Sequence, residues 1–302
     1  GDVYKRQFFV GHSSPKENPD ATLSDLSTRG IRLNYPNDLW QAHVSYREFG
    51  EEFDPAVGFN TRNGFKRVEP SVTYRPRPEN WELIRQMEFG IEFEYMTDLD
   101  NRLLKRETEL TLFELNFESA DQLSAKVVNL KEYLDKDFEI IDGNLITVGN
   151  YVTNSFQISG ETSEKRKVSA ELSYSTGEFW TGNKQTYKGE LSVKPFPGLN
   201  IQGDFEYNSV SLSAGGFDTN LYRLTLGVYP TPRTAFYSNL QYDDISNMLG
   251  LLAKLRHTIR PGSEIYKVYT HNWQSYGEGL LDFDLGTVSR VSSVKINYTH
   301  RF

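Results

Sequence analysis

Apolar and polar residues alternate along most of this chain with a period of two, the pattern of a β-strand that has one apolar face. In the segment 87–95, every odd position is Met, Phe, Ile or Tyr, whereas three of the four even positions are Glu. About sixteen such runs follow one another, roughly every nineteen residues, and helical periodicity is nearly absent. The sequence therefore predicts an all-β, antiparallel protein of about 16 strands.

Two runs break the alternation. The run 111–115 changes phase between Leu112 and Phe113, which predicts a β-bulge. Pro70 has no backbone N–H to donate, so we expect its strand either to bulge there or to begin at Ser71.

The connections between the runs alternate in length. Eight of the twelve prolines lie in tight turns: Pro36, Pro76, Pro78, Pro195, Pro197, Pro230, Pro232 and Pro261. Long connections are predicted at 12–28, 51–65, 137–150, 176–185, 208–219 and 274–286. Short turns at one end and long loops at the other are typical of outer-membrane β-barrels, whereas a soluble β-sandwich shows no such bias.

Composition supports the membrane interpretation. Only 37% of the residues are hydrophobic and the mean hydropathy is −0.57, as expected if one face of each strand contacts lipid. Aromatic residues gather near the predicted strand ends, where the headgroups would lie: Trp40, Trp81, Phe196, Tyr229, Tyr266 and Phe302 at the tight-turn end, and Tyr95, Tyr174, Trp180, Tyr207, Tyr242 and Trp273 at the other. We expect residues 1–302 to form one antiparallel up-and-down transmembrane β-barrel domain in contact with outer-membrane lipid; the alternative is a large soluble β-protein.

Charge and cysteine content limit the possible partners and cofactors. The net charge is −8 and no long basic run occurs, so no nucleic-acid partner is expected. The absence of cysteine excludes disulfides and Cys-based metal sites, and the five histidines have no metal-ligand spacing. No cofactor is expected, although calcium in the outer loops is an alternative because Asp98, Asp100, Asp243, Asp244, Asp282 and Asp284 place carboxylates there.

The segment Phe53–Phe65 is the first candidate for a ligand-binding or constriction loop. Its candidate residues are Phe53, Asp54, Pro55, Gly58, Phe59 and Arg62. Gly58 permits a sharp backbone turn, and the Arg62 guanidinium could pair with carboxylates. We favour the interpretation that Phe53, Phe59 and Phe65 pack the loop into the mouth of a barrel.

Glu88, Glu92 and Glu94 form a predicted acidic wall on one polar face, with Glu107 and Glu109 on the next strand. Such a wall would disfavour anions and admit cations or neutral solutes. The favoured alternative is an ordinary solvated face balanced by cations elsewhere in the lumen, such as Arg32, Arg47, Lys188 and Arg223.

Two weaker candidate sites are a His–Ser pair and a group of aromatic residues. His43 and Ser45 lie two residues apart on one face, the spacing of a base and a nucleophile in outer-membrane phospholipases, but no orienting partner follows them. No catalytic residue is therefore predicted in this segment. Phe179, Trp180 and Phe217 could stack on sugar rings, and interface anchoring explains them equally well.

Several stretches resemble the C-terminal barrel region of the DUF5916 proteins. They are FDPAVGFNTRNGF (53–65), ELSYSTGEFWTGNKQTY (171–187) and the downstream segments 218–243 and 259–269, within a resemblance that runs from about Phe8 to Phe302. Members of that family are bacterial surface proteins with an N-terminal carbohydrate-binding domain similar to family 9 modules. The resemblance implies that this chain is a C-terminal fragment, that residues 1–7 are a junction, and that further strands and a periplasmic carbohydrate-binding domain precede it.

The last nine residues predict a partner in assembly. Val294, Ile296, Tyr298 and Phe302 alternate with polar residues, and a terminal aromatic strand resembles the signal read by the barrel assembly machinery. Both chain ends are expected in the periplasm. The predicted function is a channel or receptor linked to carbohydrate binding or uptake; the alternatives are a hydrolase with a lumen or rim site, and a structural anchor for the missing domain.

Overall fold

The computed structural model describes residues 5–12, 20–55, 60, 62–277 and 284–299. Within these ranges the chain forms strands, turns and irregular segments, and it contains no helix. Accordingly, none of the described segments is a helix long and apolar enough to cross a membrane.

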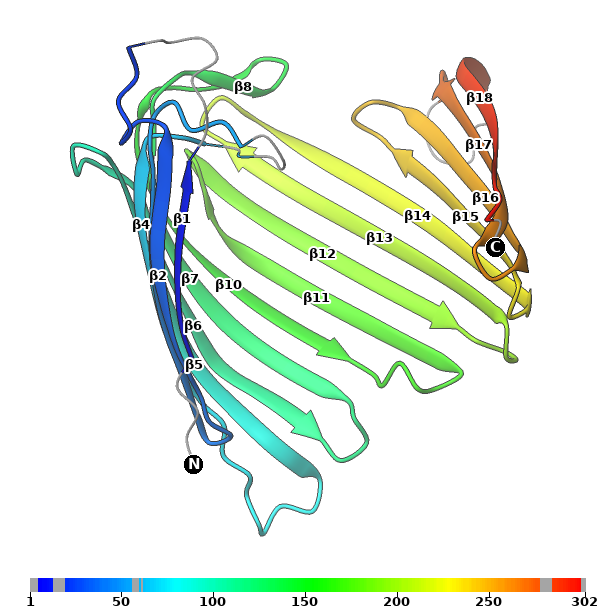
Figure 1. The fold of residues 1–302 in the computed structure, drawn as a ribbon, viewed down its shortest axis with the longest axis horizontal. Coiled ribbons are helices and arrows are strands. Elements are labelled where there is room, and N and C mark those ends of the chain that lie inside the picture. The colour runs from blue at the N-terminus through cyan, green and yellow to red at the C-terminus, as the bar shows by residue number, and fades with distance from the viewer. Residues whose placement is uncertain (1–4, 13–19, 56–59, 61, 278–283, 300–302) are drawn as a thin grey trace. The chain divides into compact units, whose positions relative to one another are not determined.

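Sixteen strands form one antiparallel sheet in which chain neighbours are also sheet neighbours (Figure 1). They are β1 (Lys5–His12), β2 (Ser27–Pro36), β3 (Trp40–Phe49), β4 (Phe65–Tyr74), β5 (Ile84–Asp98), β6 (Leu103–Phe117), β7 (Gln122–Leu134), β10 (Gly149–Glu161), β11 (Val168–Phe179), β12 (Gly182–Val193), β13 (Leu199–Leu212), β14 (Gly215–Thr231), β15 (Thr234–Asp243), β16 (Met248–Arg260), β17 (Ser263–Ser275) and β18 (Leu285–Asn297). Strands β8 (Phe138–Ile141) and β9 (Asn144–Ile146) form a separate hairpin. The predicted all-β, up-and-down arrangement of about 16 strands is confirmed. In this strand order β1 and β18 are the two edges, and the sheet is not closed into a barrel.

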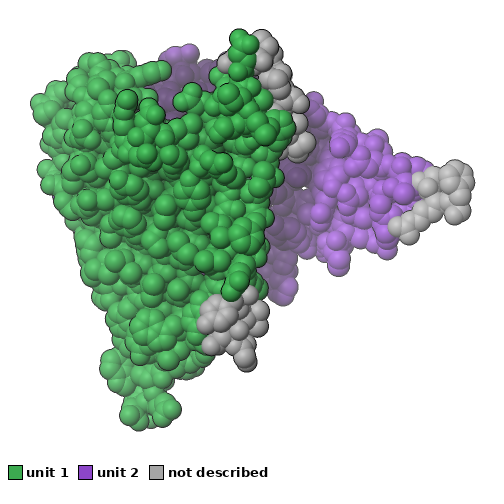
Figure 2. Space-filling view, turned by 60° about the vertical axis from the view of Figure 1, so that its left-hand side comes forward, with its two compact units in different colours: residues 1–158, 176–183, 211–215 green, residues 159–175, 184–210, 216–302 purple. Residues whose placement is uncertain are grey.

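The chain divides into two compact units, which Figure 2 colours separately. Unit 1 comprises residues 1–158, 176–183 and 211–215, and unit 2 comprises residues 159–175, 184–210 and 216–302. Unit 1 contains β1–β9, and unit 2 contains β15–β18 together with most of β14.

The bulge predicted in the segment 111–115 is confirmed, and it keeps two glutamates on one face. The pairing of β6 with β7 shifts between Thr111 and Phe113, and the pairing with β5 shifts between Glu88 and Gly90. A strand changes face at every residue, so without the extra residue Glu114 would point away from Glu109. The bulge thus keeps both glutamates on the polar face.

Both alternatives predicted for Pro70 are wrong: the strand has no bulge there, and it does not begin at Ser71. Strand β4 begins at Phe65, and Pro70 pairs in register with Val44 of β3. On the β5 side the register is continuous, but the pairing skips from Val68 to Ser71. The missing N–H of Pro70 therefore interrupts the ladder on one side and leaves the register unchanged.

Two predicted long connections are wrong. Residues 176–185 and 208–219 were expected to be loops, but only residues 180–181 join β11 to β12 and only residues 213–214 join β13 to β14. Strands β13 and β14 extend over 14 and 17 residues. Hydrogen bonds between the backbones of neighbouring strands do not require hydrophobic side chains. The segments rich in Ser, Thr and Gly therefore stay paired as strands beyond the apolar part of the sheet.

The described chain has a very small hydrophobic core. Nine apolar side chains are buried in it: Leu26, Phe53, Phe65, Leu104, Ala125, Ile146, Val210, Leu212 and Tyr242. Most of the large side chains on the apolar parity of the strands are exposed or half-buried, whereas the opposite parity carries the ion pairs of Arg47, Lys105 and Lys126. The main structural division is therefore between two faces of a sheet.

Candidate functional site on the polar face

Strands β5 and β6 place glutamates directly opposite one another on the polar face. Glu88 pairs in register with Glu114, Glu92 with Glu109, and Glu94 with Glu107. We call these six residues the glutamate ladder. Like charges opposite one another destabilise a sheet, so this arrangement requires counterions.

Cations from the same and adjacent strands supply that compensation. The Lys105 Nζ atom lies 2.8 Å from Glu107 and 3.2 Å from Glu94, so one ammonium bridges two facing carboxylates. Lys126 lies 3.2 Å from Glu109.

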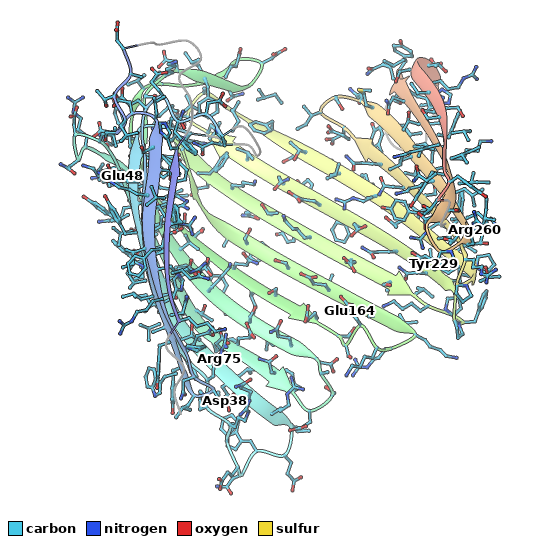
Figure 3. All side chains as sticks on the ribbon, in the orientation of Figure 1. Asp38, Glu48, Arg75, Glu164, Tyr229 and Arg260 are labelled. Carbon is cyan, nitrogen blue, oxygen red and sulfur yellow. The ribbon has the colours of Figure 1, made fainter. Side chains whose placement is uncertain are left out.

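Arg75, in the turn after β4, binds Glu88 through its Nε atom at 2.5 Å (Figure 3). On β3 and β4, Arg47 and Arg67 bind Glu69 at 3.5 and 3.3 Å. The acidic wall is therefore a network of ion pairs that spans five strands, β3 to β7.

The network keeps an acidic excess. Eight carboxylates face five cations on β3–β7 and the adjoining turn: Glu69, Glu88, Glu92, Glu94, Glu107, Glu109, Glu114 and Glu132 against Arg47, Arg67, Arg75, Lys105 and Lys126. Glu92 is exposed. A fixed negative excess on a hydrated face attracts small cations and repels anions.

The structure explains which of these residues the sequence could indicate. Alternation placed Glu88, Glu92 and Glu94 on one face, and this prediction of their relative orientation is confirmed. The balancing cations predicted from the sequence were Arg32, Arg47, Lys188 and Arg223, and among these Arg47 joins this network. Sequence reasoning missed Arg67, Arg75, Lys105, Lys126, Glu69 and Glu114, because their roles depend on cross-strand register.

His43 and Ser45 share the polar face, but their side chains bind different partners. His43 Nδ1 lies 2.6 Å from the Ser71 hydroxyl, and the fully buried Ser45 hydroxyl donates to Glu69 at 2.9 Å. His257 and His271 also bond hydroxyl groups, those of Thr234 and of Tyr269 and Thr287, so such bonds recur in this sheet. The pair His43 and Ser45 therefore forms no base–nucleophile contact.

The 53–65 loop is anchored by aromatic packing. Phe53 is buried with its ring edge against Phe49 at 5.8 Å, and Phe49 stacks on Phe65 at 4.9 Å. The Asn63 amide donates to the Phe53 carbonyl oxygen at 2.9 Å. Asp54 and Arg62 are exposed and Pro55 is half-buried, whereas Gly58 and Phe59 lie outside the described residues. Phe53 and Phe65 thus both pack against Phe49, and their predicted place in the mouth of a barrel stays a prediction.

Trp180 belongs to an aromatic cluster at the tip of the β11–β12 hairpin. Its ring makes edge contacts with Phe138 of β8 at 5.3 Å, with Tyr151 of β10 at 5.0 Å and with Phe179 at 6.4 Å. Trp180 also has a positive φ of 50°, which is strained for a bulky residue. These contacts make Trp180 a packing residue of the hairpin, and its half-buried ring remains a candidate sugar platform. Phe217, in unit 2, is half-buried on β14.

Unit 2 has its own charged cavity, of about 230 Å³. Strands β11–β14 line it, with Glu171, Lys188, Glu190, Asp204, Glu206 and Arg223 among its residues. Lys188 binds Glu206 at 3.0 Å. The Oδ2 atom of Asp204 is buried and accepts no hydrogen bond within the protein. Lys188 and Arg223, predicted as balancing cations, thus face the carboxylates of this second cluster.

The acidic residues of the turns after β5 and β15 act as hydrogen-bond acceptors. The Asp98 carboxylate accepts the Arg102 amide at 2.8 Å, and Asp243 accepts the Ile245 amide at 3.0 Å. The Asp244 carboxylate accepts both the backbone and the side-chain amide of Asn220 at 2.7 Å. Asp282 lies outside the described residues. In the described parts of the chain, no group of three or more His, Asp or Glu side chains is arranged to hold a metal ion.

Comparison with protein-family models and with curated proteins found no match to this chain.

Proposed function

We propose that this chain is the membrane-embedded β-sheet of a bacterial outer-membrane protein, and that its polar face lines a water-filled passage for small cations or neutral solutes. The observation that carries the proposal is an apolar band on the other face. On twelve strands a large apolar side chain is more than a third exposed: Leu33, Val44, Val72, Ile91, Leu110, Val152, Leu172, Leu191, Ile201, Leu224, Leu255 and Val294.

Water is a poor solvent for such a face. Complete burial of one Leu, Ile or Val side chain stabilises a protein by roughly 1.5–3 kcal/mol, so twelve partly exposed ones represent on the order of 10 kcal/mol. That amount is similar to the whole stability of an ordinary domain. Soluble monomers rarely expose continuous apolar patches of this size, whereas lipid would cover them.

The polar face supports the second half of the proposal. Partly exposed ion pairs and a carboxylate excess are favourable beside water, and they would be costly against lipid. The glutamate ladder would then face the passage and favour cations over anions.

Three predictions from the sequence extend this proposal. Free edges at β1 and β18 leave room for closure with each other or with additional strands, as a transmembrane barrel requires. The segment that ends at Phe302 would be recognised by the barrel assembly machinery, with both ends of the chain in the periplasm. The resemblance to DUF5916 proteins makes carbohydrates, or solutes related to their uptake, the first candidates for neutral substrates.

Ion selectivity tests the passage directly. The chain would be reconstituted in planar bilayers, and the reversal potential measured in a KCl gradient. The variant Glu88→Gln/Glu92→Gln/Glu94→Gln should reduce the preference for potassium over chloride, because it removes three charges from the ladder. A matched control, Glu79→Gln/Glu82→Gln/Glu118→Gln, removes three exposed charges from turns and should leave selectivity unchanged.

The other outcomes are equally informative. A folded protein that conducts no ions would favour the structural anchor. Membrane insertion itself is read from heat-modifiable gel mobility in detergent, and a chain that is monomeric and folded in water without detergent would contradict it.

A further inference from the structure

A basic and aromatic groove lies at the tight-turn end of unit 2. It has a volume of about 550 Å³, and its walls come from the β10–β11 turn, the β12–β13 turn and the end of β14. Figure 3 labels Glu164 and Tyr229 beside these turns. We infer that this groove binds the phosphate headgroup of an anionic phospholipid.

The charges lining the groove fit an anion. Lys165, Arg166, Lys167 and Lys194 contribute four cations, and no carboxylate residue is among the lining residues. The nearest acid along the chain, Glu164, contributes its main-chain oxygen, which accepts the Lys194 ammonium at 2.9 Å. A four-cation groove stands out in a chain whose net charge is −8.

The turns that carry these cations are joined by backbone hydrogen bonds. The Lys194 amide donates to the Lys167 carbonyl oxygen at 2.6 Å, and the Tyr229 amide donates to the Gly198 carbonyl oxygen at 2.6 Å. Gly198 has a φ of +93°, and a Cβ atom there would lie 2.6 Å from the Tyr229 carbonyl oxygen. Glycine is thus required at 198, and the groove is built on fixed backbone.

The apolar wall distinguishes an amphiphile from a free anion. Phe196 and Tyr229 are 59% and 51% exposed, and prolines 195 and 197 flank Phe196. Aromatic rings prefer the headgroup level of a bilayer, and lysines and arginines beside them attract anionic lipids. A phosphate group alone would use the cations and leave this wall without a function.

Exposed apolar side chains also continue along the strands that begin or end at the groove. Strand β11 begins just after Lys167 and carries Val168 and Leu172. Strand β12 ends just before Lys194 and carries Leu191, and β13 carries Ile201. All four of these apolar side chains are more than a third exposed. Acyl chains attached to a bound headgroup would lie along this surface. This continuity favours a lipid over an acidic peptide. The inference rests on the proposed membrane location.

Lipid titration of the folded full chain in a neutral detergent tests the inference. Phosphatidylglycerol and phosphatidylcholine with identical acyl chains would be added separately, and bound lipid counted by native mass spectrometry. Phosphatidylglycerol should bind more tightly. Each of the substitutions Lys165→Gln and Lys167→Gln should weaken its binding about five-fold, because a cation near an anionic headgroup contributes ~1 kcal/mol.

The matched control is Arg233→Gln, which removes a cation from the β14–β15 turn of the same unit, outside the groove. It should leave phosphatidylglycerol binding unchanged. Equal binding of the two lipids, or equal effects of Lys165→Gln and Arg233→Gln, would overturn the inference. Displacement of the lipid by millimolar inorganic phosphate would assign the groove to free phosphate instead.

Heat-modifiable mobility, measured on the same samples, separates the two proposals. A folded chain without lipid preference rejects only the groove, whereas a chain that never folds in detergent rejects the membrane proposal.

Discussion

Lys105 is the residue on which the middle of the glutamate ladder most depends, because its ammonium lies within 3.2 Å of both Glu94 and Glu107. We predict that Lys105→Gln lowers the free energy of unfolding by about 1 kcal/mol, since it leaves two facing carboxylates without their shared cation. Urea unfolding of the detergent-folded chain measures this loss.

The double variant Lys105→Gln/Glu107→Gln provides the control. It removes the cation and one of the two repelling charges, so it should recover most of the stability. If the single and double variants are equally unstable, Lys105 acts through packing of its aliphatic stem and the electrostatic account is wrong.

Asp25, in the connection between β1 and β2, gives a pH-dependent prediction. The Thr22 hydroxyl and amide donate to its carboxylate at 2.7 and 2.9 Å, and these hydrogen bonds hold the pKa of Asp25 below its usual value. Because the folded pKa is lowered, the carboxylate stabilises this turn above about pH 4 and loses that effect as the pH falls through the folded pKa.

An NMR titration of the Asp25 carboxyl group checks this prediction. Thr22→Ala should move the pKa of Asp25 back toward about 3.9, and Thr22→Ser, which keeps the hydroxyl, should preserve the low pKa. A low Asp25 pKa that persists in Thr22→Ala would show that the hydroxyl is not its cause.

Alternation of side chains along one strand predicts which residues share a face, and this was the only property of the site residues that could be predicted from the sequence. Glu88, Glu92 and Glu94 follow one parity of one strand, so their common face could be read from the sequence. The ion pair of Arg75 with Glu88 joins the turn after β4 to strand β5. Side-chain pairs of this kind depend on register, and the parity of one strand does not fix the register of two.

At the level of elements, the β11–β12 hairpin combines a strained turn with aromatic packing. Trp180 has a φ of 50°, which costs roughly 1 kcal/mol or more, yet its ring contacts Phe138 and Tyr151. Aromatic pairs contribute about 0.5–1.5 kcal/mol each, enough to offset that strain. The rings thereby join the β8–β9 hairpin to the sheet.

We predict that Trp180→Ala speeds amide hydrogen exchange in β8 and β9, because it removes the ring and keeps the strain. Trp180→Gly should be the milder change, since glycine accepts a positive φ. Leu145→Ala, on an exposed position of β9, is the control and should change exchange little. Equal exchange rates in wild type and Trp180→Ala would show that the cluster does not hold the hairpin.

The positions of strands were predicted best where the two faces of a strand differ most in polarity. The number of strands and the bulge after Leu112 follow from the alternation of apolar and polar residues. The prolines marked the turns less well, because Pro36 and Pro230 lie within β2 and β14. The hairpins at 180–181 and 213–214 lie among Ser, Thr, Gly and Asn, which look alike in a loop and in a solvated strand. Composition alone therefore could not show that β11–β14 continue to these turns.

For the whole molecule, the decisive property is which solvent contacts each face. The described residues of the chain bury only nine apolar side chains, so the protein gains little from a dry core. Its stability must come from backbone pairing, polar networks on one face and whatever covers the apolar band. Alternation in the sequence predicted the apolar band, but it could not show that β1 and β18 are the two edges of the sheet, because edges depend on how whole strands pair.

Substitutions of Leu224 and Gln241 can show in one experiment whether lipid or water covers the apolar face. The two residues lie on β14 and β15, where Leu224 pairs with Leu240 and Arg223 with Gln241, so both sit at nearly the same height on opposite faces. Leu224 is 49% exposed. If lipid covers its face, Leu224→Lys should cost about 2–4 kcal/mol near the bilayer midplane, and Gln241→Lys should cost almost nothing. If water covers that face, replacing an exposed leucine by lysine should change stability by no more than about 0.5 kcal/mol. Equilibrium unfolding of both variants in lipid vesicles measures the difference, and equal stabilities would remove the physical basis for placing this sheet in a membrane.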